Sequence, residues 1–147
     1  MIESTYLILL VHGPNLNLLG ERNPEVYGNT SLAEIESNVL NEAKKRGAEI
    51  KTFQSNHEGE IIDVLHDERH WANGILINAG AYSHYSYAIR DAIEAINIPT
   101  IEIHLSNIQT RETFRKKSVL SSVCLDTVSG LGKNSYLEGL KILITKQ

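Results

Sequence analysis

Side chains that can bind anions and move protons cluster directly after the apolar segments of this 147-residue chain. The candidates are Asn15, Arg22, Tyr27, Asn56, His57, Asn78, His84, His104, Ser106, Arg111 and Arg115. Tyr27 and Arg22 share one glycine-containing loop. A guanidinium favours a nearby phenolate, which otherwise costs about 4 kcal/mol to form at neutral pH. The pair can therefore act as a base beside a carbonyl group, although an anchoring tyrosine and a surface arginine would give the same pattern.

A second candidate group surrounds His104, which follows Glu102 by two residues in an apolar segment. Alternate residues of a strand share one face, so the Glu102 carboxylate can orient the imidazole for proton donation to a departing hydroxyl. A structural histidine bonded to a backbone carbonyl fits the same spacing. The backbone N–H groups of Leu105 and Ser106 can hold a carboxylate, and an ordinary turn is the alternative there.

Familiar catalytic motifs are missing from the sequence. His66 and His70 are spaced i, i+4, but neither H-E-x-x-H nor H-x-x-E-H is completed, so no metal is expected. There is no G-x-G-x-x-G after the first apolar segment, no Walker A sequence and no G-x-S-x-G. No lysine lies in the middle of a predicted strand with clearly apolar surroundings, as a Schiff-base carrier would. Cys124 is expected in the core, within a strand.

Apolar runs of strand length alternate with amphipathic segments. The predicted strands are 6–11, 49–55, 74–78, 100–104 and 122–128. The predicted helices are about 31–46 (opened by a Ser-x-x-Glu capping box), 59–70, 85–96 and 134–145, with a long loop at 15–30 and a helical turn at 111–117. This order predicts one α/β domain, residues 1–147, with a flavodoxin-like, doubly wound five-stranded parallel sheet and helices on both faces. Ligands of such sheets bind beyond the carboxyl ends of the strands, where the candidate side chains collect.

Composition and charge limit the kinds of binding partner that we expect. The net charge of −4 disfavours nucleic acid, so any anion site must be built locally from arginines and backbone N–H groups. A single cysteine excludes an internal disulfide. No apolar run approaches the roughly 20 residues of a membrane span, and no signal-peptide pattern opens the chain. We therefore expect a cytoplasmic protein without a membrane partner.

Seven segments in order, spread over nearly the whole chain, resemble the type II 3-dehydroquinate dehydratases. The likeness begins with His12-Gly-Pro-Asn-Leu-Asn-Leu-Leu-Gly20, and residues 21–28 then resemble that family's catalytic lid. The other matching segments are 54–60 (QSNHEGE), 77–84 (INAGAYSH), 102–107 (EIHLSN), 111–115 (RETFR) and 130–132 (GLG).

The resemblance implies reversible dehydration of 3-dehydroquinate to 3-dehydroshikimate, through an enolate and without metal or organic cofactor. By this analogy Tyr27 is the base, Arg22 sustains its anion, Asn15 holds the enolate and His104 protonates the leaving hydroxyl. The resemblance also assigns Asn78, Leu105 and Ser106 to the carboxylate, His84 and Arg115 to ring hydroxyls, Arg111 and Glu102 to lid, interface or support roles, and Asp91 to a neighbouring subunit's site. The lid would span about residues 17–30, and the assembly would be a dodecamer built from trimers.

Three residues depart from the family pattern: Tyr85 stands where a small residue is usual, and Lys117 and Val119 where His and Tyr are common. Two alternatives remain beside a biosynthetic dehydratase. One is a non-catalytic flavodoxin-like binding or regulatory module, which would not need Tyr27, Arg22 and His104 together. The other is the same reaction in quinate catabolism, which sequence cannot separate from aromatic biosynthesis.

Overall fold

The computed structural model describes residues 5–21 and 23–146, and its centre is a five-stranded parallel sheet. The strands are β1 (Tyr6–His12), β2 (Ala48–Gln54), β3 (Gly74–Asn78), β4 (Thr100–Ile103) and β5 (Asp126–Val128). Their order is β2-β1-β3-β4-β5, and every adjacent pair is parallel. This is the flavodoxin-like order, so the predicted fold class is confirmed.

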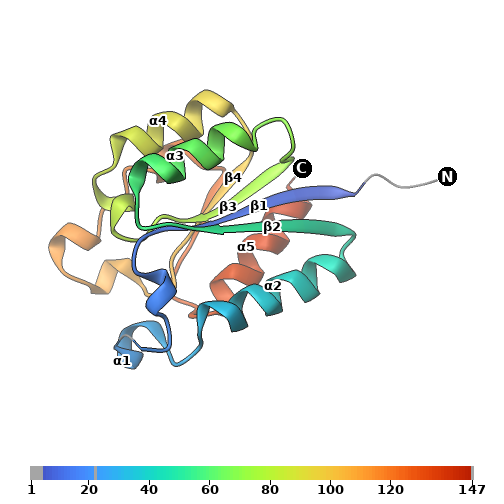
Figure 1. Ribbon diagram of the computed structural model, residues 1–147. Helices are drawn as coiled ribbons and strands as arrows, with labels where there is room; N and C mark the ends of the chain where they lie inside the picture. The colour runs from blue at the N-terminus through green and yellow to red at the C-terminus, as the bar shows by residue number, and fades with distance from the viewer. Residues whose placement is uncertain (1–4, 22, 147) are drawn as a thin grey trace.

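Two helices cover each face of the sheet (Figure 1). They are α2 (Leu32–Lys45) and α5 (Asn134–Thr145) on one side, and α3 (Glu58–Asp67) and α4 (Tyr87–Ile96) on the other. Alternate residues of β1 pack into the two layers: Ile8 and Leu10 join the α2–α5 cluster, and Leu9 and Val11 join the α3–α4 cluster. Burial on both faces explains why β1 is a continuous apolar run.

Serine caps fix where two helices begin. The Ser31 hydroxyl accepts a hydrogen bond from the Glu34 N–H at 3.2 Å, as the capping box predicts. The Ser86 hydroxyl does the same for the Ile89 N–H at 3.0 Å, so α4 begins at Tyr87 rather than near residue 85. The preceding residues form a 3-10 helix, η2 (Gly80–His84).

The chain between β4 and β5 departs most from the predicted elements. The expected helical turn at 111–117 is present as the 3-10 helix η4 (Thr113–Arg115), and a second 3-10 helix, η3 (Ile108–Thr110), precedes it. The expected strand at 122–128 is shortened to β5, because η5 (Ser121–Val123) occupies its first half. Cys124 therefore follows η5 rather than lying in a strand, although it packs against the α3–α4 cluster as a half-buried core residue.

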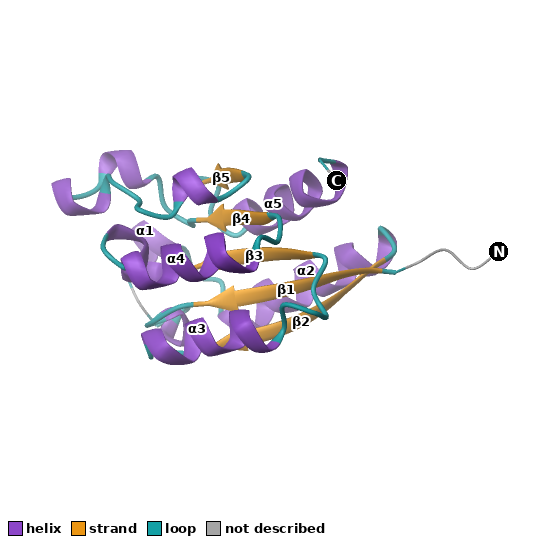
Figure 2. Cartoon of the chain, turned by 90° about the horizontal axis from the view of Figure 1, so that it is seen from above, coloured by secondary structure: helices purple, strands orange, loops and turns teal. Residues whose placement is uncertain are grey.

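The loops beyond the carboxyl ends of the strands gather at one edge of the sheet (Figure 2). The loop after β1 contains η1 (Leu16–Leu18) and α1 (Pro24–Tyr27). It packs closely on the loop after β3, because a Cβ at Gly13 would lie 2.3 Å from the Ala79 carbonyl oxygen. Gly80 has φ +60° and faces the Pro14 carbonyl, so both glycines are needed for this approach. Within the described ranges, no helix is both long and apolar enough to cross a membrane.

Candidate active site

A pocket at the carboxyl edge collects most of the predicted site residues. Its empty volume is about 580 Å³, which includes open solvent at its mouth. Eight predicted residues line it: Asn15, Asn78, His84, His104, Leu105, Ser106, Arg111 and Arg115. Pro14, Leu16, Gly80, Ala81 and Ile108 complete the lining. The pocket therefore draws on the loops after β1, β3 and β4, as expected of a doubly wound sheet.

The described lining does not include four more residues that the family resemblance assigns to the site. Arg22 lies outside the described residues, and so does the side chain of Tyr27, whose backbone ends α1. Among the residues that the structure describes, Asp91 is exposed on α4 and does not line the pocket. Glu102 does not line it either, because this fully buried residue lies behind His104.

Glu102 and His104 form a buried pair at the end of β4. The carboxylate Oε2 lies 2.5 Å from the imidazole Nε2, and the two residues are 0% and 6% exposed. An ionised carboxylate can only accept hydrogen bonds, so Nε2 carries a proton directed at Glu102. The second ring nitrogen, Nδ1, is then the one that can exchange a proton with a ligand in the pocket.

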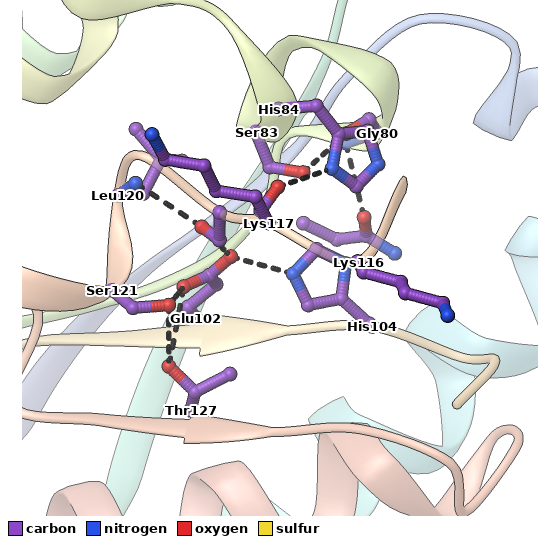
Figure 3. A network of polar contacts seen from close by, with 12 residues as sticks. Gly80, Ser83, His84, Glu102, His104, Lys116, Lys117, Leu120, Ser121 and Thr127 are labelled. Carbon is purple, nitrogen blue, oxygen red and sulfur yellow. Dashed lines mark hydrogen bonds and ion pairs between the residues drawn. The ribbon is translucent and has the colours of Figure 1, made fainter. Parts of the chain in front are cut away.

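Three hydroxyl groups also surround the Glu102 carboxylate (Figure 3). Ser118 donates to Oε2 at 2.6 Å, and Ser121 and Thr127 reach Oε1 at 2.7 and 3.2 Å. Burial raises the pKa of Glu102, but the imidazole and the two serine hydroxyls outweigh it, so the net pKa lies below the ordinary value. Sequence reasoning did not find these hydroxyls. The available signal was a glutamate inside an apolar strand, which must find donors.

His84 faces His104 across the pocket, and backbone geometry fixes its tautomer. The two imidazoles are stacked with ring centroids 6.4 Å apart. His84 Nδ1 lies 2.7 Å from the Lys117 carbonyl oxygen, which can only accept, so Nδ1 is the protonated nitrogen. Burial lowers the pKa of His84, and neighbouring His104 and Arg115 lower it further against the effect of the carbonyl. Neutral His84 thus offers Nε2 as an acceptor for a ligand hydroxyl.

Asn78 is held by a buried chain of hydrogen bonds on the α2–α5 side of the sheet. Its Oδ1 accepts from the Gly80 N–H at 3.1 Å, which directs its amide nitrogen to the Tyr136 hydroxyl at 3.0 Å. The Tyr136 proton is then free to point at His12 Nδ1, 3.3 Å away, and His12 Nε2 lies 3.3 Å from the Glu36 carboxylate. This chain fixes the amide orientation, so the second Asn78 N–H can serve a ligand in the pocket.

The turn after His104 and the two arginines make the pocket suitable for an anion. The carbonyl oxygens of Leu105 and Ser106 accept from Gly132 and Gly130 at 3.0 and 3.1 Å. The Leu105 carbonyl is turned towards Gly132. Because peptide bonds are trans, the Ser106 N–H points in the opposite direction from this carbonyl. The Arg111 guanidinium donates to the Ser106 hydroxyl at 3.1 Å.

Glu112 connects the two arginines and was also missed by sequence reasoning. Its carboxylate lies 2.8 Å from Arg115 Nε and 3.8 Å from Arg111 Nε. The pKa of Glu112 is lowered, chiefly by its own backbone N–H; burial opposes this effect, and the guanidinium groups of Arg115 and Arg111 lower the pKa further. The exposed carboxylate therefore forms ion pairs with both arginines.

The three departures from the family pattern leave this geometry intact. Tyr85 is 60% exposed and packs edge-on against Tyr82, with ring centroids 5.7 Å apart. Lys117 is exposed and bonds His84 through its backbone carbonyl, so its side-chain identity does not affect that contact. Val119 is buried, and its N–H donates to the Ser83 carbonyl at 2.8 Å.

The described part of the pocket combines an imidazole–carboxylate pair, a neutral imidazole, an oriented amide and two arginines. Such a set can bind a hydroxylated carboxylic acid and protonate a leaving oxygen atom. Fold and pocket together define a flavodoxin-like α/β protein with a site for acid–base chemistry on a small anion.

Comparison with known proteins identifies the family. The family model described as "Dehydroquinase class II" matches residues 6–144. Proteins named 3-dehydroquinate dehydratase from Nostoc sp. and Bacillus mycoides are 54% and 52% identical, over 93% and 95% of both chains. The crystal structure of a type II dehydroquinase from Butyrivibrio crossotus has a TM-score of 0.94 and 41% identity, covering 97% of this chain and 99% of that one. The chain belongs to the class II dehydroquinase family.

Proposed function

We propose that this protein is a hydro-lyase that converts 3-dehydroquinate reversibly to 3-dehydroshikimate, through an enolate and without metal or organic cofactor. The observation that carries the proposal is the buried Glu102–His104 pair beside an anion-binding pocket, in a chain that belongs to the class II dehydroquinase family. A carboxylate-held imidazole is suited to deliver a proton to a departing hydroxyl, which is the step that a dehydration requires.

The base is assigned to the loop after β1. Tyr27, as a phenolate sustained by Arg22, removes the proton beside the ketone, and Asn15 holds the resulting enolate oxygen, directly or through a water. The support from the structure is the position of Asn15, which lines the pocket with φ +69° and whose N–H donates to the Asn56 side chain at 3.0 Å. Residues 17–30 form a lid that closes over the substrate and excludes water.

The acid and the binding groups are assigned to the loops after β3 and β4. His104, protonated on both ring nitrogens, gives its Nδ1 proton to the leaving hydroxyl, which departs as water, and Glu102 supports the ring through Nε2. The substrate carboxylate binds the Asn78 amide and the backbone N–H groups of Leu105 and Ser106. His84 and Arg115 bind ring hydroxyls, and Arg111 supports the lid.

Assembly and cellular role follow from the same family. We infer a single catalytic domain over residues 1–147, trimers that assemble into a dodecamer, and an Asp91 that reaches a neighbouring subunit's site. The exposure of Asp91 on α4 leaves it available for that contact. We place the enzyme in the cytoplasm, in the shikimate pathway of aromatic amino acid biosynthesis.

The test is to mix the purified protein with 3-dehydroquinate and follow ultraviolet absorbance, because the product is a conjugated enone and the substrate is not. A steady rise that survives EDTA, with no organic cofactor added, supports a dehydratase that needs no metal. No rise from folded protein would refute the proposal and favour a non-catalytic binding module.

A further inference from the structure

The Glu102 carboxylate accepts hydrogen bonds from hydroxyl groups as well as from the His104 imidazole. Oε2 takes hydrogen bonds from His104 Nε2 and the Ser118 hydroxyl, and Oε1 takes one from the Ser121 hydroxyl (Figure 3). Thr127 Oγ1 lies 3.2 Å from Oε1 and 3.4 Å from Ser121 Oγ, so its single proton is shared between these acceptors. Both carboxylate oxygens are therefore occupied as acceptors in a residue that is fully buried.

The direction of the Ser118 hydrogen bond is fixed by its neighbour. The Leu120 N–H donates to Ser118 Oγ at 3.1 Å, so the hydroxyl uses a lone pair there and its proton points at Glu102. If Glu102 became protonated, its new O–H would face groups already arranged as donors. The surrounding hydroxyls must then turn, and buried polar groups lose partners.

We propose that Ser118 and Ser121 are positioning residues that keep Glu102 a carboxylate and thereby hold His104 with Nε2 protonated and Nδ1 available to the substrate. The inference rests on the proposed role of His104 as the acid. Both serines lie in the chain segment after the pocket arginines, and Lys117 in the same segment accepts from His84 at 2.7 Å. One segment thus orients both imidazoles of the site.

The charges around Glu102 are consistent with this arrangement. Among the residues that the structure describes, His84 and Cys124 are titratable groups that interact with Glu102 besides His104. Burial and the Glu102 charge raise the pKa of the Cys124 thiol to about 12, so the thiol stays neutral and uncharged at physiological pH. Within the described residues, the groups that lower the pKa of Glu102 are His104 and the hydroxyls of Ser118 and Ser121.

The test compares Ser118→Ala and Ser121→Ala with a control, Ser122→Ala. Ser122 lies next to Ser121 in η5, and its hydroxyl contacts Arg90 instead of Glu102. Ser121→Thr keeps the hydroxyl and should restore wild-type behaviour. The Glu102 carboxyl carbon, ¹³C-labelled, is titrated by NMR, and kcat is measured against pH in parallel. Ser121 is exposed at the surface, so its substitution should leave the fold intact, which circular dichroism checks.

We expect the two alanine variants to move the Glu102 titration to higher pH and to lower kcat on the order of tenfold on the acid side of the profile, with recovery as pH rises. Ser122→Ala and Ser121→Thr should match the wild type in both measurements. An unmoved Glu102 titration in Ser118→Ala and Ser121→Ala would overturn the inference, whatever the kinetics. A moved titration with unchanged kcat would uphold the positioning of Glu102 and instead refute His104 as the acid.

Discussion

Glu102 Oε2 lies 2.5 Å from His104 Nε2 at the carboxyl end of β4, and both side chains are shielded from solvent. The pair joins the sheet to the pocket: the carboxylate is anchored behind the site and the imidazole forms part of its wall. A buried charge beside a titratable ring ties the chemistry of the site to the ionisation of one glutamate.

The first prediction is that Glu102→Gln lowers kcat on the order of 100-fold and changes KM little, because an amide cannot hold the imidazole as an ionised carboxylate does. Steady-state kinetics with 3-dehydroquinate measure both constants. Glu42→Gln, which removes a surface pair with Arg46, is the control and should behave as wild type. A kcat within threefold of wild type in Glu102→Gln would remove the carboxylate from the mechanism.

The same glutamate should make stability depend on pH. Its pKa is lower in the folded protein than in the unfolded chain, so its stabilising effect is complete above the unfolded pKa. The effect is lost as pH falls from that value through the folded pKa. Urea unfolding between neutral and acidic pH should therefore show a steeper loss of stability for wild type than for Glu102→Gln. Parallel curves for the two proteins would contradict the lowered pKa.

A third prediction concerns His84 and its backbone partner. His84→Ala should raise KM about tenfold, since the neutral imidazole loses its hydrogen bond to a substrate hydroxyl. Lys117→Ala should leave KM unchanged, because Lys117 contacts His84 through its carbonyl oxygen. Substrate-saturation curves of the two variants and the wild type give the three KM values. A large KM effect from Lys117→Ala would mean that its side chain, not its backbone, serves the site.

The buried chain behind Asn78 gives a fourth prediction. Tyr136→Phe removes the hydroxyl between Asn78 and His12, and should lower the free energy of unfolding by about 1–3 kcal/mol because buried polar groups lose a partner. Tyr6→Phe removes a longer and more exposed hydrogen bond to the Asn73 carbonyl and should cost less. Chemical denaturation of the two variants gives the comparison. Equal losses of unfolding free energy in the two variants would contradict a larger stabilising contribution from the hydrogen bonds behind Asn78.

Sequence patterns predicted the strands and helices, in which apolar residues recur at a fixed spacing. The apolar runs marked the sheet and its helices, the capping box at Ser31 marked the start of α2, and the i, i+2 spacing placed Glu102 and His104 on one face. The serines that hold Glu102 were not predictable, because they are 16 and 19 residues away along a segment of 3-10 turns without a period. The role of Tyr136 was not predictable for a related reason. It occupies a core position of α5, and its hydroxyl partner Asn78 is 58 residues away.

The measurement that tests the central claim most directly follows 3-dehydroquinate by proton NMR in D₂O with wild type, Tyr27→Phe and His104→Gln. The claim is that Tyr27 removes the proton whose loss forms the enolate, and that His104 then protonates the hydroxyl that leaves from it. Wild type should form 3-dehydroshikimate. His104→Gln should exchange the proton beside the ketone for deuterium with little product, and Tyr27→Phe should show neither change. Product formation at a near-normal rate by Tyr27→Phe, or by His104→Gln, would contradict the account.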